Sequence, residues 1–211
     1  MENKFSLIGT PSKTLFYSTL SLLIANLVTI YFAITQGWSL SSILIIYWIQ
    51  SVIIGIFNFF RILMLKEFDV AGFSINDVPA VMNDQTKRST AFFFLFHFGF
   101  FHVFYLIFII LLVASDFFTH KGLAVSSLLA IIVTSTIFFL NHLFSFMPKV
   151  NRDKITKPNI GTMMFLPYLR IIPMHIIIVF GAVTNGGPET LLLFMSLKTV
   201  ADVLMHIFEN K

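Results

Sequence analysis

Residues 90–114 read TAFFFLFHFGFFHVFYLIFIILLVA, without one Asp, Glu, Lys or Arg. A helix rises about 1.5 Å per residue, so a run of this length crosses the roughly 30 Å hydrocarbon core of a bilayer. The run is apolar on nearly every face and does not alternate polar and apolar residues, which excludes a lipid-facing β-strand. It therefore predicts a membrane-spanning helix.

The composition of the whole chain agrees with this prediction. Of its 211 residues, 57% are hydrophobic and only 11% are charged. Soluble domains average about 45–50% apolar and about 25% charged residues, and a globule of this size has no core large enough to hide the excess. The class is an integral membrane protein. The absence of cysteine excludes disulfides, thiolate metal sites and Cys nucleophiles.

Six apolar runs, each long enough to cross a bilayer, follow one another along the chain. They cover residues 14–35, 40–65, 90–114, 123–147, 164–184 and 189–208. The fourth run stops at Pro148, and the fifth stops at the turn sequence NGGP of residues 185–188. The first run is too long for the apolar region of a signal peptide, so we expect it to be retained. We expect an all-α, polytopic transmembrane bundle of six helices, forming a single domain over residues 1–211.

Basic residues between the runs predict the orientation of the bundle. With six spans, the N-terminus, the second and fourth loops and the C-terminus share one side. That side carries ten of the 14 basic residues, whereas the opposite side carries only Lys121. The ten are Lys4, Lys13, Lys66, Lys87, Arg88, Lys149, Arg152, Lys154, Lys157 and Lys211. Cytoplasmic loops carry excess Lys and Arg, so both termini should be cytoplasmic.

This bias also explains the net charge of +4 without a nucleic-acid partner, since no basic run is long enough for a nucleic-acid tail. We expect a multi-pass protein of the plasma (inner) membrane, with the lipid bilayer as its partner. The basic segment 149–157 should contact anionic lipids. The long loop 67–89 is either a lid over the inner mouth or an ordinary solvated linker. The oligomeric state stays open.

Polar side chains inside the predicted spans share one depth. The topology places nearly all of them in the cytoplasmic half, on several different helices, where each is costly unless it faces the bundle interior. The candidates for ligand binding are Gln50, Asn58, Arg61, Arg170, Lys198 and Asp202. Asn26 and Asn141 are further amides within the spans. This convergence predicts a polar site that opens to the cytoplasm.

Asp202 is the acid that lies firmly inside the predicted spans. It shares one helical stripe with Lys198 and His206, at spacings of four residues. A structural role would pair it with Lys198, Arg61 or Arg170 and so set the helix register. A functional role would make it a proton or cation acceptor. Both interpretations are open.

Five histidines are candidate metal ligands, since imidazole is a common ligand and a carboxylate lies nearby. They are His97, His102, His142, His175 and His206. Three histidines, or two with one carboxylate, would suffice for a divalent metal, although the chain has no HExxH or HxxxH motif. Haem held by paired histidines in Phe-rich surroundings is the second cofactor candidate. Each histidine could equally be a hydrogen-bond partner between helices.

Four segments carry a resemblance to a known family. They are YWIQSVIIGIFNFFRIL (47–63), FHFGFFHVF (96–104), YLRIIPMHIIIVFG (168–181) and LKTVADVLMH (197–206). The chain resembles small multi-spanning prokaryotic membrane proteins that are classified as a domain of unknown function. The resemblance implies marked positions among the polar residues above and implies no reaction.

The sequence thus predicts a membrane protein with a cytoplasm-facing polar and histidine site inside the membrane, which binds or transports an ion or a small polar ligand. The alternative is an intramembrane enzyme that depends on a metal or haem, in which the metal activates water.

Overall fold

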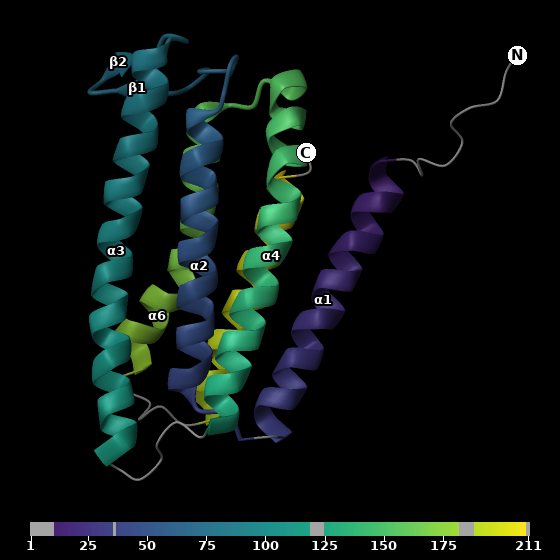
Figure 1. Cartoon of the computed structure of the whole chain (residues 1–211), viewed down its shortest axis with the longest axis vertical. Coiled ribbons are helices and arrows are strands. Elements are labelled where there is room, and N and C mark those ends of the chain that lie inside the picture. The colour runs from purple at the N-terminus through teal and green to yellow at the C-terminus, as the bar shows by residue number, and fades with distance from the viewer. Residues whose placement is uncertain (1–10, 36, 119–124, 182–187, 210–211) are drawn as a thin grey trace, which may run out of the picture.

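The computed structural model describes residues 11–35, 37–118, 125–181 and 188–209, with some side chains in these ranges left out of the description. The fold is all-α, as predicted. Its helices are α1 (Pro11–Thr35), α2 (Leu40–Leu63), α3 (Asp84–Phe118), α4 (Val125–Thr156), α5 (Ile160–Phe165), η1 (Leu166–Arg170), α6 (Ile171–Gly181) and α7 (Pro188–Glu209). The long helices run up and down side by side, and α1 leans away from α2, α3 and α4 (Figure 1).

Four of the described helical segments are long and apolar enough to cross a membrane. They are Leu40–Leu63, Asp84–Ser115, Ile131–Thr156 and Ile160–Ile178, which correspond to the second, third, fourth and fifth predicted spans. The first and sixth predicted spans lie on α1 and α7, where several side chains are outside the description. That these two helices also cross the membrane stays a prediction.

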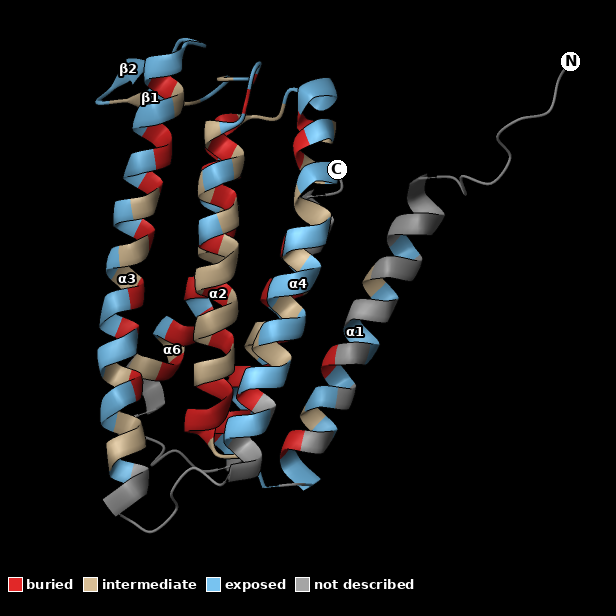
Figure 2. Ribbon diagram, in the orientation of Figure 1, coloured by how far each residue is buried: buried red, intermediate tan, exposed pale blue. Residues whose placement is uncertain are grey.

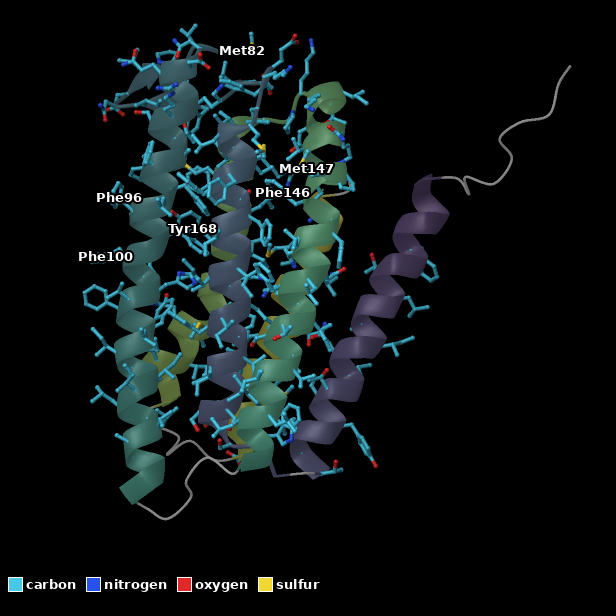
Figure 3. The ribbon with its side chains drawn as sticks, in the orientation of Figure 1. Met82, Phe96, Phe100, Phe146, Met147 and Tyr168 are labelled. Carbon is cyan, nitrogen blue, oxygen red and sulfur yellow. The ribbon has the colours of Figure 1, made fainter. Side chains whose placement is uncertain are left out.

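The outer faces of the bundle are apolar, as contact with lipid requires. Exposed residues line the outer sides of α3 and α4, whereas buried residues gather on α2 (Figure 2). Phe96 of α3 is 73% exposed and Phe144 of α4 is 76% exposed. Phe96 and Phe100 point away from the other helices (Figure 3). Large apolar patches of this kind are rare on soluble monomers.

Two helices extend past the ends of the predicted spans for local reasons. Helix α3 begins at Asp84 rather than residue 90, because the Asn83 side chain accepts a hydrogen bond from the Thr86 amide at 2.7 Å and caps the helix. Helix α4 passes through Pro148 and continues to Thr156. A proline inside a helix removes one backbone hydrogen bond, and α4 continues because its last turns are anchored to α2, as shown below.

Helices α2 and α3 pack tightly at Gly55. A Cβ atom added to Gly55 would lie 2.6 Å from Cε1 of Phe98, whose side chain is buried. Earlier on α2, Trp48 Nε1 donates a hydrogen bond to the backbone carbonyl of His102 on α3 at 2.8 Å. The missing side chain at position 55 therefore lets the two helices approach.

We expect Gly55→Ala to destabilise the protein relative to Gly99→Ala by about 1–3 kcal/mol, the usual cost of overpacking. Gly99 is the matched control, because a Cβ atom there would meet nothing within 4 Å. Thermal unfolding in detergent, followed through the fluorescence of Trp38 and Trp48, measures the difference. Equal unfolding temperatures for the two variants would contradict this packing.

The segment between α2 and α3 is folded. Strands β1 (Ser74–Ile75) and β2 (Val78–Pro79) form a hairpin, and Asn76 and Asp77 in its turn have φ of 51° and 63°. Two positive φ values in a row are typical of a two-residue hairpin turn, for which Asn and Asp are favoured. The hairpin lies at the upper end of α3 (Figure 1).

This segment is tied to the connection between α4 and α5. The Asp69 amide donates to the Pro158 carbonyl at 3.0 Å, and the Ile160 amide donates to the Asp69 carbonyl at 2.9 Å. The Asp69 carboxylate accepts hydrogen bonds from the Asn159 side chain and the Ala71 amide. These hydrogen bonds hold the pKa of Asp69 below its ordinary value, with the Asn159 bond the larger cause. The loop is therefore folded and hydrogen-bonded at this end of the bundle, while most of its residues are exposed to solvent.

Candidate functional site

A cavity of about 850 Å³ lies among α1, α2, α4, the α5–η1 segment and α7. It extends from Asn26 and Lys198 to the α4–α5 connection at Lys157, Pro158 and Asn159. All six predicted ligand-binding residues line it: Gln50, Asn58, Arg61, Arg170, Lys198 and Asp202. The described residues of the 67–83 segment do not line it, so its lining gives the lid interpretation no support.

Asp202 is at the centre of a buried ion-pair cluster. Its Oδ1 accepts from Arg170 Nη2 at 2.6 Å, and its Oδ2 accepts from Lys198 Nζ at 2.6 Å. Lys198 also donates to Asn26 Oδ1 at 2.9 Å. The Asp202 and Arg170 side chains are only 6% and 8% exposed. The cluster joins α1, η1 and α7. Asp202 pairs with Lys198 and Arg170, two of the three partners considered for it from the sequence.

A proline places Arg170 in this cluster. In a continuous α-helix, the Met163 carbonyl would accept from the amide of residue 167, but Pro167 has no N–H. The helix narrows there to the 3₁₀ segment η1. The Asn58 side chain donates to the Met163 carbonyl at 3.0 Å instead. Asn58 of α2 thus supports the break that precedes Arg170.

Asn58→Leu should therefore cost about 1–3 kcal/mol, the penalty for a buried carbonyl that loses its donor. Asn141→Leu is the matched control, since Asn141 lines the same cavity but is exposed. Unfolding in detergent compares the two variants. An equal, small loss for both would mean that the Asn58 hydrogen bond does not support the break.

A second buried ion pair joins α2 to the end of α4. Arg61 donates to Asp153 through both Nε, at 2.5 Å, and Nη2, at 2.8 Å. The Asp153 side chain is 4% exposed. This two-point contact anchors the helical turns that follow Pro148.

Sequence reasoning missed Asp153, because the fourth span was ended at Pro148. A signal was present in the helical period, which continues through the proline. The residues of α4 that line the cavity recur at spacings of three and four: Phe138, Asn141, His142, Ser145, Phe146, Lys149, Arg152, Asp153 and Thr156. This is one face of a single helix.

The described histidines do not come together. His102 is buried between α2 and α3, where its Nδ1 donates to the Phe98 carbonyl and its Nε2 is therefore left to accept from the Ser51 hydroxyl. His97 is exposed and is hydrogen-bonded to the Tyr168 hydroxyl at 2.8 Å. His175 is exposed and does not line the cavity. His102 thus serves as a hydrogen-bond partner between helices.

His142 does line the cavity, and its Nδ1 donates to the Phe138 carbonyl at 3.1 Å. The side chain of His206 lies outside the described residues. Among the side chains that the structure describes, no three His, Asp or Glu groups are placed to hold a metal ion. Within the described residues, the geometry therefore gives no support to a metal site built from three of these five histidines, or from two of them with a carboxylate.

The cavity has a positive excess of charge. Its described lining holds six basic side chains, Arg61, Lys149, Arg152, Lys157, Arg170 and Lys198, and two acidic ones, Asp153 and Asp202. Lys157 also pairs with the exposed Glu67 at 2.5 Å, and this hydrogen bond lowers the pKa of Glu67. The chemistry available here is the binding of a polar or negatively charged group.

Comparisons with known proteins identify the family of the chain and no activity. None of the curated proteins matches the chain, and none of the solved structures does. One family model matches residues 10–211, which is nearly the whole chain. The chain therefore belongs to the family of unknown function DUF6498.

Proposed function

We propose that this protein is a multi-pass protein of the plasma membrane that binds, and in doing so senses or transports, a small polar or charged ligand. Four helices long enough to cross a bilayer support the membrane location. The excess of basic residues on one side supports cytoplasmic termini. In that orientation, the α4–α5 connection and the cavity end beside it face the cytoplasm.

One observation carries the proposal: all six polar residues expected to bind a ligand line the same cavity. Polar side chains at this depth are costly in hydrocarbon, and they mark ligand pathways in membrane proteins. The cavity has the size of a small-molecule site, for which about 300–1,000 Å³ is usual. It also reaches the α4–α5 connection, which gives a ligand a route from the cytoplasm.

Thermal unfolding in the presence of small solutes tests the proposal. Purified protein is titrated separately with phosphate, acetate, potassium and magnesium, and the unfolding temperature is followed. Gln50→Leu keeps the size of a cavity-lining side chain and removes its polar group. Gln85→Leu, an exposed position on α3 away from the cavity, is the matched control.

At least one solute should stabilise wild type and Gln85→Leu but not Gln50→Leu. A ligand at about 100 times its Kd adds about 2.7 kcal/mol of stability, which is easily measured. If no solute stabilises wild type more than Gln50→Leu, the cavity is not a ligand site and the proposal fails.

A further inference from the structure

We propose that the ligand is an oxyanion of the phosphate type, held by the guanidinium of Arg170 beside Lys198. This inference rests on the proposed function and names its substrate class. Two independent observations carry it, one from charge and one from hydrogen bonding.

The first observation is a positive charge that no described side chain of the cluster compensates. The cluster of Arg170, Lys198 and Asp202 contains two cations and one carboxylate, and Asn26 contributes a neutral oxygen. The other acid in the cavity lining, Asp153, is engaged at both oxygens by Arg61. A net positive charge in a buried site is costly unless it is paired. A bound anion would complete the pairing.

The second observation is a set of unused donors. Among the described residues, Nε and Nη1 of Arg170 are buried and have no hydrogen-bond partner, although Nη2 binds Asp202. Buried N–H groups without an acceptor are rare in native structures. The fork of donors on a guanidinium matches the oxygens of a carboxylate or phosphate.

Aromatic rings pack near the guanidinium of Arg170, so its Nε and Nη1 edge is the part that can bind a ligand. Its Cζ lies 5.3 Å from the ring centre of Tyr47 and 5.7 Å from that of Phe138, so aromatic side chains pack around it. Because Nε and Nη1 are buried, the binding of a ligand to them requires the cavity wall to move. Lys149 and Arg152, nearer the cavity mouth, attract an anion toward this point.

A phosphate oxyanion has two sources that share this chemistry: free inorganic phosphate, and the headgroup of an anionic phospholipid. The experiment therefore has two arms. In the first, full-length protein in phosphatidylcholine nanodiscs is titrated with inorganic phosphate by calorimetry. In the second, phosphatidylglycerol that remains bound after detergent purification is measured by mass spectrometry.

Two variants of cavity residues, Arg170→Lys and Lys198→Met, test the placement of the site, and Arg88→Lys is the control. Arg170→Lys keeps the charge and removes the donor fork, while Arg88→Lys makes the same change at an exposed residue of α3. Lys198→Met leaves Arg170 and Asp202 as a neutral pair, so it tests the charge while the Arg170–Asp202 ion pair remains. Each cavity variant should weaken binding at least about tenfold, the value of one charge-assisted hydrogen bond, and Arg88→Lys should not change it.

The outcomes separate cleanly. Phosphate binding by wild type that weakens in both cavity variants identifies a free anion as the ligand. Retention of phosphatidylglycerol that is lost in both variants identifies a lipid headgroup. If wild type retains neither, or if Lys198→Met and Arg170→Lys bind as wild type does, the oxyanion site is refuted. Stabilisation by acetate, potassium or magnesium would then leave the proposed function standing without this ligand class.

Discussion

Asp202→Asn is expected to lower the free energy of unfolding by about 3–5 kcal/mol, the cost of removing one partner of a buried ion pair. The carboxylate contacts Arg170 and Lys198, both at 2.6 Å, and its side chain is 6% exposed. The amide would leave the buried Arg170 and the partly buried Lys198 facing each other without a counter-charge. Unfolding in detergent, followed through the fluorescence of Trp38 and Trp48, measures the loss.

Asp84→Asn is the matched control for this substitution. Asp84 pairs with Lys87 at the same distance of 2.6 Å, but its side chain is 79% exposed, so little stability should be lost. The double variant Asp202→Asn, Lys198→Met should recover part of the loss, because one of the two facing cations is gone. If Asp202→Asn and Asp84→Asn behave alike, the cluster does not stabilise the bundle.

Arg61→Met is expected to have an effect of similar size, about 3–5 kcal/mol, because it leaves the buried Asp153 carboxylate without a partner. The structural consequence should be local to the end of α4. The turns after Pro148 depend on this contact, so amide hydrogen exchange should rise between Pro148 and Thr156.

A double-mutant cycle separates pairing from packing. Arg61→Met and Asp153→Asn each break the pair, and the double variant removes both charges. The double variant should be more stable than the sum of the two single losses predicts. Lys157→Met, which removes an exposed pair with Glu67, should change little. Strictly additive losses at Arg61 and Asp153 would show that the two charges do not stabilise each other.

The helices could be predicted from the sequence because hydrocarbon demands apolar side chains along a whole span. Their ends could not, since ends depend on single contacts that hydropathy does not report. Asn83 starts α3 earlier than the apolar run does, and Pro148 interrupts neither α4 nor its cavity-facing stripe. Pro148 predicts a helix end, but the contact of α2 with the last turns of α4 holds the helix together through it.

The polar cavity was predicted because the burial of charge is costly enough to leave a pattern in the sequence. Residues such as Arg170 and Asp202 have few places to lie except against each other. The histidines left no such pattern, since a neutral imidazole is satisfied by one carbonyl and one hydroxyl, as His102 is. The depth of a histidine in the membrane follows from its position along the span. Which neighbouring helix its side chain faces depends on how the helices pack, and the sequence does not reveal that packing.

The absence of cysteine allows a single thiol to report whether water fills the cavity within the membrane. Asn141→Cys lies on the cavity lining of α4, and Leu140→Cys lies next to it on the exposed apolar face. Inside-out membrane vesicles expose the cytoplasmic side to a charged, membrane-impermeant thiol reagent. The cavity predicts that Asn141→Cys reacts rapidly from this side and that Leu140→Cys stays unmodified. Equal reactivity, or modification of Asn141→Cys only from the opposite side, would contradict a water-filled cavity that opens to the cytoplasm.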